Sequence, residues 1–453
     1  LMSMKILKSS NGFSIPLVIG LIMMFGAMGV AIATVTVMNL KFASHQQKSE
    51  TALQVAEAGV NYYLWHLSHD SSDYKDGNTT PVNPPYGPYT HDYKDTSGRK
   101  IGTYTLTITP PSSGSTITTI QSVGKVDGIK GTRTVLAQIG QPSFSNYIFL
   151  SNTQMRFSSD STTTGPVHSN VGIEFSGTNN GPVTAGQATY NDGSGNHPGV
   201  WGTGGPKSQW QYPVPTVNFN QVTANFNDLR TKSQNGGVYL NNSGGIGFNI
   251  RMRYDNSGSF DLYRVNSEGT NGINTTFIRN QAAPSNGIVF STENVWISGG
   301  SGGGAGYKGR ITIAAARLPD NPSQRRNIRI TNNLDYASQD GTNAIGLIAQ
   351  NDVFVPRYAP NTMTVDAALL AQYGSVGYDT TNGPLKTSFT LYGAIAQYQN
   401  DYGFKVTGCG SYCRGFPITQ YNFDDHLVYA PPPMFPTTGN YTILNWREQL
   451  YSP

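Results

Sequence analysis

The densest group of reactive side chains in this sequence is Asp424, Asp425 and His426, within YNFDDHLVY. Two carboxyl groups beside an imidazole can hold a metal ion or act as acid and base; the alternative is an ordinary solvated turn. His168, in GPVHSN, falls near a predicted corner of the chain and is interpreted as a structural hydrogen-bonding residue. Acids are otherwise sparse between residues 143 and 453, and there is no Ser/His/Asp set, phosphate-binding loop or redox motif. The sequence therefore predicts no catalytic residue, no metal and no cofactor.

Two short segments have the oxygen-rich composition of calcium loops: DYKDGN at 73–78 and NDGSGN at 191–196. Neither has the ligand spacing of an EF-hand. Calcium binding at either segment is a hypothesis, with an ordinary polar turn as the alternative.

Aromatic side chains offer a second kind of chemistry, which is binding. Trp201, Trp210 and Tyr212 lie in GVWGTGGPKSQWQYPVP, and exposed aromatics beside amide side chains commonly contact sugars or partner proteins. The alternative is that they pack under a long loop as a small satellite core. We treat the three as candidate ligand contacts, with surface glycans or host and partner proteins as the expected ligands.

The only two cysteines are Cys409 and Cys413, in GCGSYCRG. A C-x-x-x-C pair with no neighbouring histidine makes a poor zinc site. The spacing favours a small local disulfide in an oxidising compartment, with two free thiols as the alternative.

The composition points to many short strands with a polar, weakly charged surface. Charged residues make up 12% of the 453 residues, glycine occurs 52 times and the net charge is +4. Because no block of lysine and arginine stands out, nucleic acid is not an implied partner.

The stretch from Phe13 to Met38 carries no charge and is a candidate membrane-spanning segment. It is too long for the apolar core of a cleaved signal peptide. As a helix it would rise about 39 Å, enough to cross a bilayer with some tilt. Lys5 and Lys8 precede it, so the positive-inside rule leaves the rest of the chain outside the cytoplasm.

The helix is expected to continue beyond the membrane. Apolar residues then follow helical spacing, and neither proline nor glycine occurs from 41 to 57; the apolar positions are Leu53, Ala56, Val60, Leu64 and Leu67. We predict one rod over 13–69, with 13–38 in the membrane. The alternative is a membrane helix followed by a separate soluble helix.

The N-terminal region resembles type IV pilin-like proteins, and its AEAG segment resembles that of PilX-type minor pilins. The resemblance rests on a short basic leader ending in Gly12, then Phe13, the long apolar helix, and ALQVAEAGVNYYL. It implies that a prepilin peptidase cuts after Gly12, that the amine of Phe13 is methylated, and that the mature helix packs against other pilin subunits. The assembly residues that it implies are Phe13, Pro16, Leu17, Ala56, Glu57, Ala58 and Gly59.

Two positions depart from the major pilins. Leu17 stands where major pilins carry a glutamate, which is thought to pair with the N-terminal amine of a neighbouring subunit. A subunit without this carboxylate suits a minor, tip or priming role. Pro16 falls in the first helical turn, where its missing N–H has no intrahelical partner.

The fold class expected is α+β, mostly β. A polar loop over 70–100 precedes three strand-like runs, KIGTYTLTITP, TITTIQSVGKV and GTRTVLAQIG, which predict a small antiparallel sheet. Residues 143–453 show no convincing long helix, but repeat a short β run, a polar corner and a second β run. This favours an irregular right-handed parallel β-helix; a β-sandwich or jelly roll is the alternative. The predicted divisions are 1–12 leader, 13–69 helix, 70–142 loop and pilin-like sheet, and 143–453 head.

The end of the chain, HLVYAPPPMFPTTGNYTILNWREQ, also resembles the β-rich domains that follow PilX-type N-termini. The sequence thus predicts a non-enzymatic minor subunit of a pilus or pseudopilus, tip or priming, whose head serves capping or adhesion. It would reside in the cytoplasmic membrane as a single-pass protein and later in a cell-surface pilus. The alternatives are a membrane-anchored polysaccharide-binding or polysaccharide-cleaving β-helix protein, and an envelope protein that is neither cleaved nor assembled.

Overall fold

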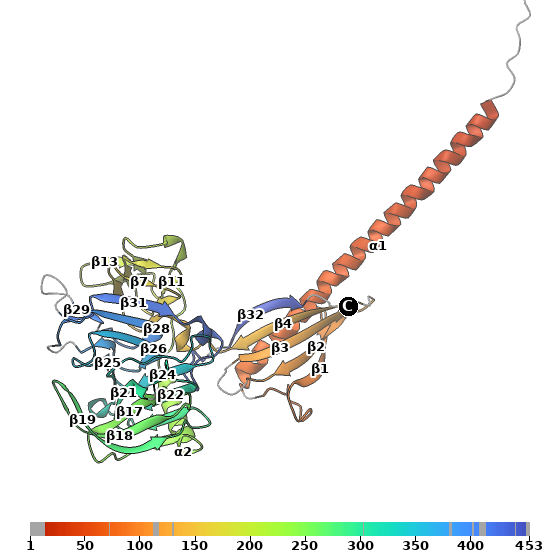
Figure 1. Ribbon diagram of the computed structural model, residues 1–453. Helices are drawn as coiled ribbons and strands as arrows, with labels where there is room; N and C mark the ends of the chain where they lie inside the picture. The colour runs from red at the N-terminus through yellow and green to blue at the C-terminus, as the bar shows by residue number, and fades with distance from the viewer. Residues whose placement is uncertain are drawn as a thin grey trace, which may run out of the picture. The chain divides into compact units, whose positions relative to one another are not determined.

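The computed structural model describes residues 14–71, 73–111, 117–128, 131–301, 303–379, 383–400, 403–406, 414–439 and 441–449. Gly12, Phe13, Cys409 and Cys413 lie outside these ranges, so their predicted roles stay predictions. The chain forms two compact units (Figure 1). The first contains residues up to Thr109, Ile120–Ala137 and the chain from Asn445, and the second contains Pro110–Thr119 and Gln138–Leu444.

A single helix, α1 (Ser14–His69), runs for 56 residues, or about 84 Å. This confirms that the apolar and amphipathic stretches form one helix. It is long and apolar enough to cross a membrane. Thr34 and Thr36 donate their hydroxyl hydrogens to the carbonyls of Val30 and Ile32, which satisfies polar groups inside the apolar stretch.

The second half of α1 packs on a five-stranded sheet, ordered β1-β2-β3-β4-β32. The strands are β1 (Tyr86–Lys94), β2 (Lys100–Thr109), β3 (Ile117–Val126), β4 (Thr132–Gly140) and β32 (Thr442–Gln449). On the helix, the face that meets the sheet is buried at helical spacing; its residues are Ala52, Val55, Ala56, Val60, Tyr63 and Leu67. The predicted small sheet is therefore present, with two strands more than the sequence analysis assigned to it.

The two additional strands, β1 and β32, lie in segments that the sequence assigned to a loop and to the head. Residues 70–100 were expected to be loop because of the turn signals in PVNPPYGPYTHDY, but 86–94 form β1, an edge strand, where its single proline, Pro88, is tolerated. Residues 442–449 were assigned to the head, but β32 joins β4 in the small sheet. This pairing brings together residues some 300 positions apart, as the 315-residue separation of Arg133 and Glu448 illustrates. The head is thus an insertion between two strands of the small sheet.

The head begins as a stack of three-strand coils. The strands are β5 (Phe149–Ser151), β6 (Met155–Phe157), β7 (Thr162–Thr163), β8 (Val167–Ser169), β9 (Ile173–Phe175), β10 (Thr178–Asn179) and β11 (Val183–Ala185). Each pairs in parallel with its counterpart one coil later: β5 with β8 and β8 with β11, β6 with β9, and β7 with β10. The predicted parallel sheets are confirmed, and the handedness of the coils stays a prediction.

A second run of coils builds two longer walls. One wall holds β16 (Val238–Leu240), β20 (Ile288–Ser291), β22 (Arg310–Ala315), β24 (Ala344–Ala349), β26 (Thr362–Ala371) and β28 (Ser388–Gln397). The other holds β17 (Gly247–Arg253), β21 (Asn294–Ser301), β23 (Ile328–Ile330), β25 (Val353–Val355) and β27 (Val376–Tyr378), and continues at its edge into the hairpin of β18 (Phe260–Gly269) and β19 (Gly272–Gln281).

The order of strands in the first wall is β15-β11-β8-β5-β28-β26-β24-β22-β20-β16. The chain therefore enters the solenoid in its middle and winds outward to β15 (Trp210–Gln211). After the helix α2 (Gln221–Gln234) it resumes at the other end with β16 and winds back. The two runs meet where β28 pairs in parallel with β5, Ile395 opposite Phe149. We call this pairing the seam.

Two apolar clusters stabilise the head. One fills the inside of the coils, and the other lies on the outer face of the first wall. Phe226 and Leu229 of α2 belong to the outer cluster, where Phe226 meets Phe290 of β20 edge to face. No long helix was expected in the head, and α2 is accordingly short, with 14 residues.

The remaining elements are short connections and edge strands. They are β12 (Thr189–Asn191), β13 (Asn196–Pro198), β14 (Val200–Trp201), β29 (Lys405–Val406), β30 (Arg414–Gly415), β31 (Ile418–Phe423), and the 3₁₀ turns η1 (Phe144–Asn146), η2 (Lys207–Gln209), η3 (Pro322–Gln324) and η4 (Asp425–Val428).

Candidate functional site

The first half of α1 presents its apolar side chains without any cover from its own chain. Phe25 is 63% exposed and Phe42 is 71% exposed. An 18-residue window of this helix has none of its residues buried. Fully burying one large apolar side chain is worth about 1.5–3 kcal/mol, so a row of them needs lipid or other protein around it.

The start of the described helix matches what the sequence predicts. Pro16 lies in the first turn, where a proline costs no hydrogen bond. Leu17 is 60% exposed. The first turn, as described from Ser14, contains no acidic side chain, so no carboxylate stands there to receive a neighbour's amine.

The AEAG segment lies on the face of α1 that meets the sheet. Ala56 is fully buried and Gly59 is buried, while Glu57 and Ala58 are half-buried. A Cβ on Gly59 would lie 2.4 Å from Ser122 Oγ and 2.9 Å from Tyr104 Cδ2. In this chain the small residues of the segment therefore let the helix approach its own sheet.

The far end of α1 is tied to the sheet by two histidine–aspartate contacts. His66 Nε2 lies 3.1 Å from Asp73 Oδ2, and His91 Nε2 lies 2.6 Å from Asp76 Oδ2. Tyr62 donates its hydroxyl to Asp76 Oδ1 at 2.9 Å. The DYKDGN oxygens, considered above as calcium ligands, thus face donors of their own chain.

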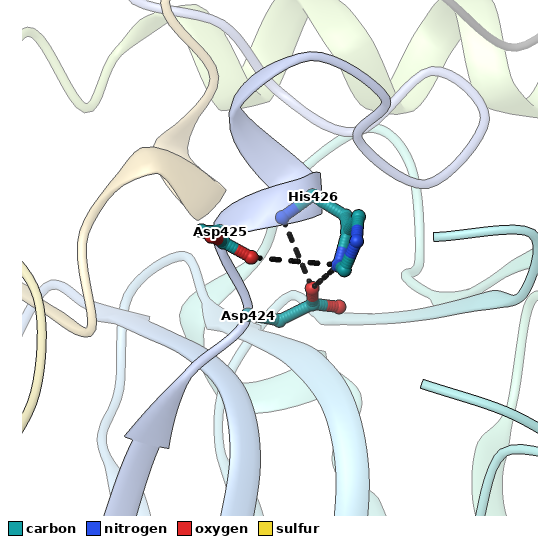
Figure 2. A group of neighbouring side chains, drawn as sticks. All are labelled: Asp424, Asp425 and His426. Carbon is teal, nitrogen blue, oxygen red and sulfur yellow. Dashed lines mark hydrogen bonds and ion pairs between the residues drawn. The ribbon is translucent and has the colours of Figure 1, made fainter. Parts of the chain in front are cut away.

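In the head, Asp424, Asp425 and His426 lie together at the start of η4 (Figure 2). Asp424 is 2% exposed, whereas the side chain of Asp425 is 83% exposed and that of His426 is 40% exposed. Asp424 Oδ1 accepts the backbone N–H of His426 at 3.2 Å and lies 3.1 Å from its Nδ1. Asp424 is therefore the N-cap of the short turn.

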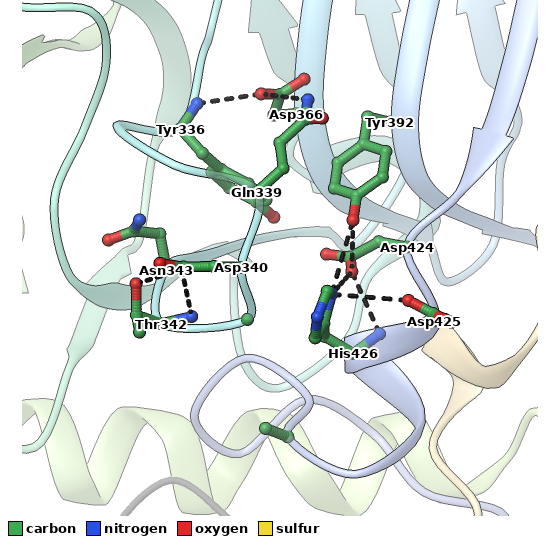
Figure 3. A network of polar contacts seen from close by, with 12 residues as sticks. Tyr336, Gln339, Asp340, Thr342, Asn343, Asp366, Tyr392, Asp424, Asp425 and His426 are labelled. Atoms are coloured by element: carbon green, nitrogen blue, oxygen red, sulfur yellow. Dashed lines mark hydrogen bonds and ion pairs between the residues drawn. The ribbon is translucent and has the colours of Figure 1, made fainter.

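A wider polar network surrounds this cap (Figure 3). Tyr392 of β28 donates its hydroxyl to Asp424 Oδ1 at 3.1 Å. Asp366 on β26 lies opposite Tyr392 in the strand register. It accepts hydrogen bonds from the backbone N–H of Tyr336 at 3.0 Å and from the side-chain amide of Gln339 at 3.2 Å. The network ties two surface loops to the wall of the solenoid. Asp366 and Tyr392 were not predicted as part of this group, because both lie far from 424–426 along the chain.

The two buried carboxyls of this network hold their protons unusually well. Burial raises the pKa of Asp366 to about 6, against the opposing donors from Tyr336 and Gln339. Burial also raises the pKa of Asp424, against the opposing contacts with His426 and Tyr392. Such acids could donate protons in catalysis. Here, however, both are enclosed and already bound by donors of their own chain, so the geometry describes a brace between loops and wall.

This burial gives a pH-dependent prediction for Asp366→Asn. A carboxyl whose folded pKa exceeds its unfolded value lowers stability as pH rises from about 4 through 6. Unfolding by urea should therefore show the variant more stable than the parent at pH 8, by up to about 3 kcal/mol, and similar to it near pH 3. Asp425→Asn is the control, because Asp425, next to Asp424, has an exposed side chain. It should change the free energy of unfolding by less than about 0.5 kcal/mol at both pH values. A loss of stability in Asp366→Asn at pH 8 would show that the charged carboxylate is the stabilising form.

The aromatic residues of the insertion do not form one continuous face. Trp201 stacks on His197 with 3.8 Å between ring centroids and donates its Nε1 hydrogen to Tyr190. Trp210 packs against the inner core at the end of the solenoid. Tyr212 is 39% exposed. Both tryptophans thus take part in packing, and Tyr212 offers the most open ring of the three.

His168 has the structural role expected from the sequence. It is buried, with Nδ1 2.9 Å from Thr184 Oγ1 and Nε2 3.1 Å from Asn170 Oδ1. Burial lowers the pKa of His168 below its usual value, although the contact with Asn170 opposes this. The side chain joins adjacent coils at a corner.

Comparison with known proteins returns little. No protein-family model and no curated protein matches this chain. One solved structure that is similar to it is the competence-associated pilin ComZ from Thermus thermophilus, with 13% sequence identity and a TM-score of 0.29. The match covers 89% of this chain and 98% of that chain. A TM-score this low does not establish a shared fold.

Proposed function

We propose that this chain is a structural minor subunit of a type IV pilus or pseudopilus-like filament, placed at the tip or used in priming, with an extracellular head for capping or adhesion. The observation that supports it most is the division of α1. Its first half is apolar and uncovered, and its second half packs on an antiparallel sheet of its own unit. A helix of this kind suits lipid before assembly and neighbouring helices afterwards.

The start of the helix supports a place at the end of the filament. Leu17 provides no carboxylate for the amine of a subunit ahead. A buried amine without a partner is costly, so a subunit with Leu17 would be a poor acceptor within a shaft. A subunit with nothing ahead of it needs no such acceptor.

The two chain segments that begin and end the head lie side by side, which supports its use as a tip domain. Thr438 donates its N–H to the carbonyl of Pro142, and Phe144 donates its N–H to that of Pro436, both at 2.8 Å. Ser143 and Thr437 form an isolated antiparallel bridge between these bonds. Both ends of the insertion therefore leave the solenoid side by side, so a pull on the head would be shared by two strands.

We propose a non-enzymatic role for the head. The support is that Asp366 and Asp424, its acids with raised pKa values, are held by donors of their own chain. For adhesion, surface glycans or partner proteins are the proposed ligands, with Tyr212 as the most accessible of the candidate aromatic contacts.

The first test is the N-terminal mass of the protein from cells with and without prepilin peptidase. We expect a chain that starts at Phe13 and carries one added methyl group, only when the peptidase is present. Gly12→Val should keep its leader, whereas Gly20→Ala, whose added Cβ would meet nothing within 4 Å, should be processed normally. An intact leader in cells with active peptidase would refute the filament proposal. Gold-labelled antibodies against the head should then mark filament ends; labelling along the shaft would refute the tip role.

A further inference from the structure

A groove runs along α1 just beyond its apolar half. It has a volume of about 700 Å³ and lies between the helix and two glycines, Gly128 and Gly131. Its helical side is lined by Val37 and Leu40, then by Lys41, His45 and Lys48. All of these residues belong to the first unit.

The lining changes character along the helix. Positions 37, 41 and 48 follow spacings of four and seven, so their side chains share one face. Val37 and Leu40 are 50% and 66% exposed and continue the apolar surface of the helix. Lys41, His45 and Lys48 come next, over roughly 16 Å of helix measured from Val37. One end of the groove is thus apolar and the other cationic.

The cations of the groove have no acidic partner of their own. Across the part of the chain that the structure describes, no carboxylate lies within ion-pair distance of Lys41 or Lys48. Glu50, the nearest acid along the helix, lies 3.6 Å from Arg133, which also pairs with Glu448. Gly128 leaves room for the end of Lys48, because a Cβ there would lie 3.0 Å from Lys48 Nζ.

We infer that this groove binds the headgroup of an anionic phospholipid, with the phosphate between Lys41 and Lys48 and the acyl chains along Val37 and the helix below it. The inference rests on the membrane placement of α1 in the proposed function. It is favoured over an acidic partner protein because the groove is continuous with the apolar half of the helix, and so opens at the depth where headgroups lie. Unpaired lysines beside a membrane span attract anionic lipids. The site would hold the subunit upright in the bilayer before assembly.

The test uses the full chain in detergent micelles, titrated with phosphatidylglycerol or phosphatidylcholine and followed by native mass spectrometry. We expect a preference for phosphatidylglycerol of about 30-fold, with about 5-fold from each lysine. The variant Lys41→Gln/Lys48→Gln should bind the two lipids about equally. Lys94→Gln/Lys308→Gln removes the same charge from exposed positions outside the groove, and should keep the preference.

Three results would overturn the inference. The first is an unchanged preference in Lys41→Gln/Lys48→Gln, and the second is the absence of any preference in the parent. The third is a self-association that depends on these lysines without lipid preference, which would assign the groove to a second copy of the chain. A parallel flotation assay distinguishes failure of the lipid site from failure of the membrane placement of α1. It uses phosphatidylcholine vesicles with about 30% phosphatidylglycerol, so that the membrane surface is negatively charged. A chain that does not float would refute membrane placement itself, whereas a chain that floats without selectivity would refute only the lipid site.

Discussion

Replacing Gly124 with valine is expected to separate α1 from its sheet and to lower the stability of the first unit by at least about 3 kcal/mol. A Cβ at Gly124 would lie 2.1 Å from the carbonyl oxygen of Ala52 and 2.5 Å from the nitrogen of Ala56. Both are backbone atoms of the helix, so no side-chain rotation relieves the clash. Valine is the better strand former, so the sign of the effect reports the helix contact rather than strand propensity.

Hydrogen exchange of the full chain in detergent would measure this effect. In Gly124→Val, the amides of α1 around Ala52–Val60 and of β3 should lose protection together, while the coils of the head keep theirs. Gly131→Val is the matched control, because a Cβ at Gly131 would meet nothing within 4 Å. It should change protection little. Normal protection in Gly124→Val would mean that the helix is not held this close to β3.

The second large effect is expected at the seam of the solenoid, in Phe149→Ala. Phe149 is 9% exposed and lies on β5 between Ile395 of β28 and Val167 of β8. Its ring meets those of Phe157 and Tyr421 edge to face, at 5.1 and 4.8 Å. Truncating a buried phenylalanine costs about 3–5 kcal/mol. Because the seam joins the two runs of coils, both should lose stability together.

Urea unfolding followed by hydrogen exchange would separate the two runs. Peptides from β8 in the first run and β26 in the second should become exposed at the same, lower urea concentration in Phe149→Ala. Phe277→Ala is the control, since Phe277 is 56% exposed and its ring meets that of Tyr263 on the neighbouring strand; it should cost less than about 1 kcal/mol. If only the β8 peptides shifted, the seam would not couple the runs.

Several elements follow from local sequence alone. The apolar run to Met38 and the helical spacing that follows it determine α1, because the absence of proline and glycine from 41 to 57 lets the helix continue beyond the apolar part. Alternation in 100–109, 117–126 and 132–140 determines three strands of the small sheet, whose inner side chains face α1. The repeated β run and polar corner determine parallel coils. In each case the signal lies within one window of the chain.

Other features depend on contacts that no local window contains. The strand at 442–449 looks like any strand of the head, and only its pairing with β4 makes the head an insertion. At the seam, Phe149 of β5 pairs with Ile395 of β28, almost 250 residues later in the chain. No periodicity in the sequence predicts this pairing. The prolines at 81, 84, 85 and 88 predict a loop, and only the edge position of β1 in the sheet makes Pro88 acceptable within a strand.

The candidate sites divide in the same way. The sequence by itself determined the membrane-length helix, the leucine at position 17 and the cluster at 424–426, because each is a property of neighbouring residues. Only the tertiary structure decided that Asp424 caps a turn and shares a network with Asp366 and Tyr392, and that the tryptophans pack rather than form one face. It alone placed Lys41 and Lys48 beside Gly128 and Gly131 in one groove. The physical reason is that burial and pairing, which fix protonation, accessibility and charge complementarity, arise only when distant segments meet.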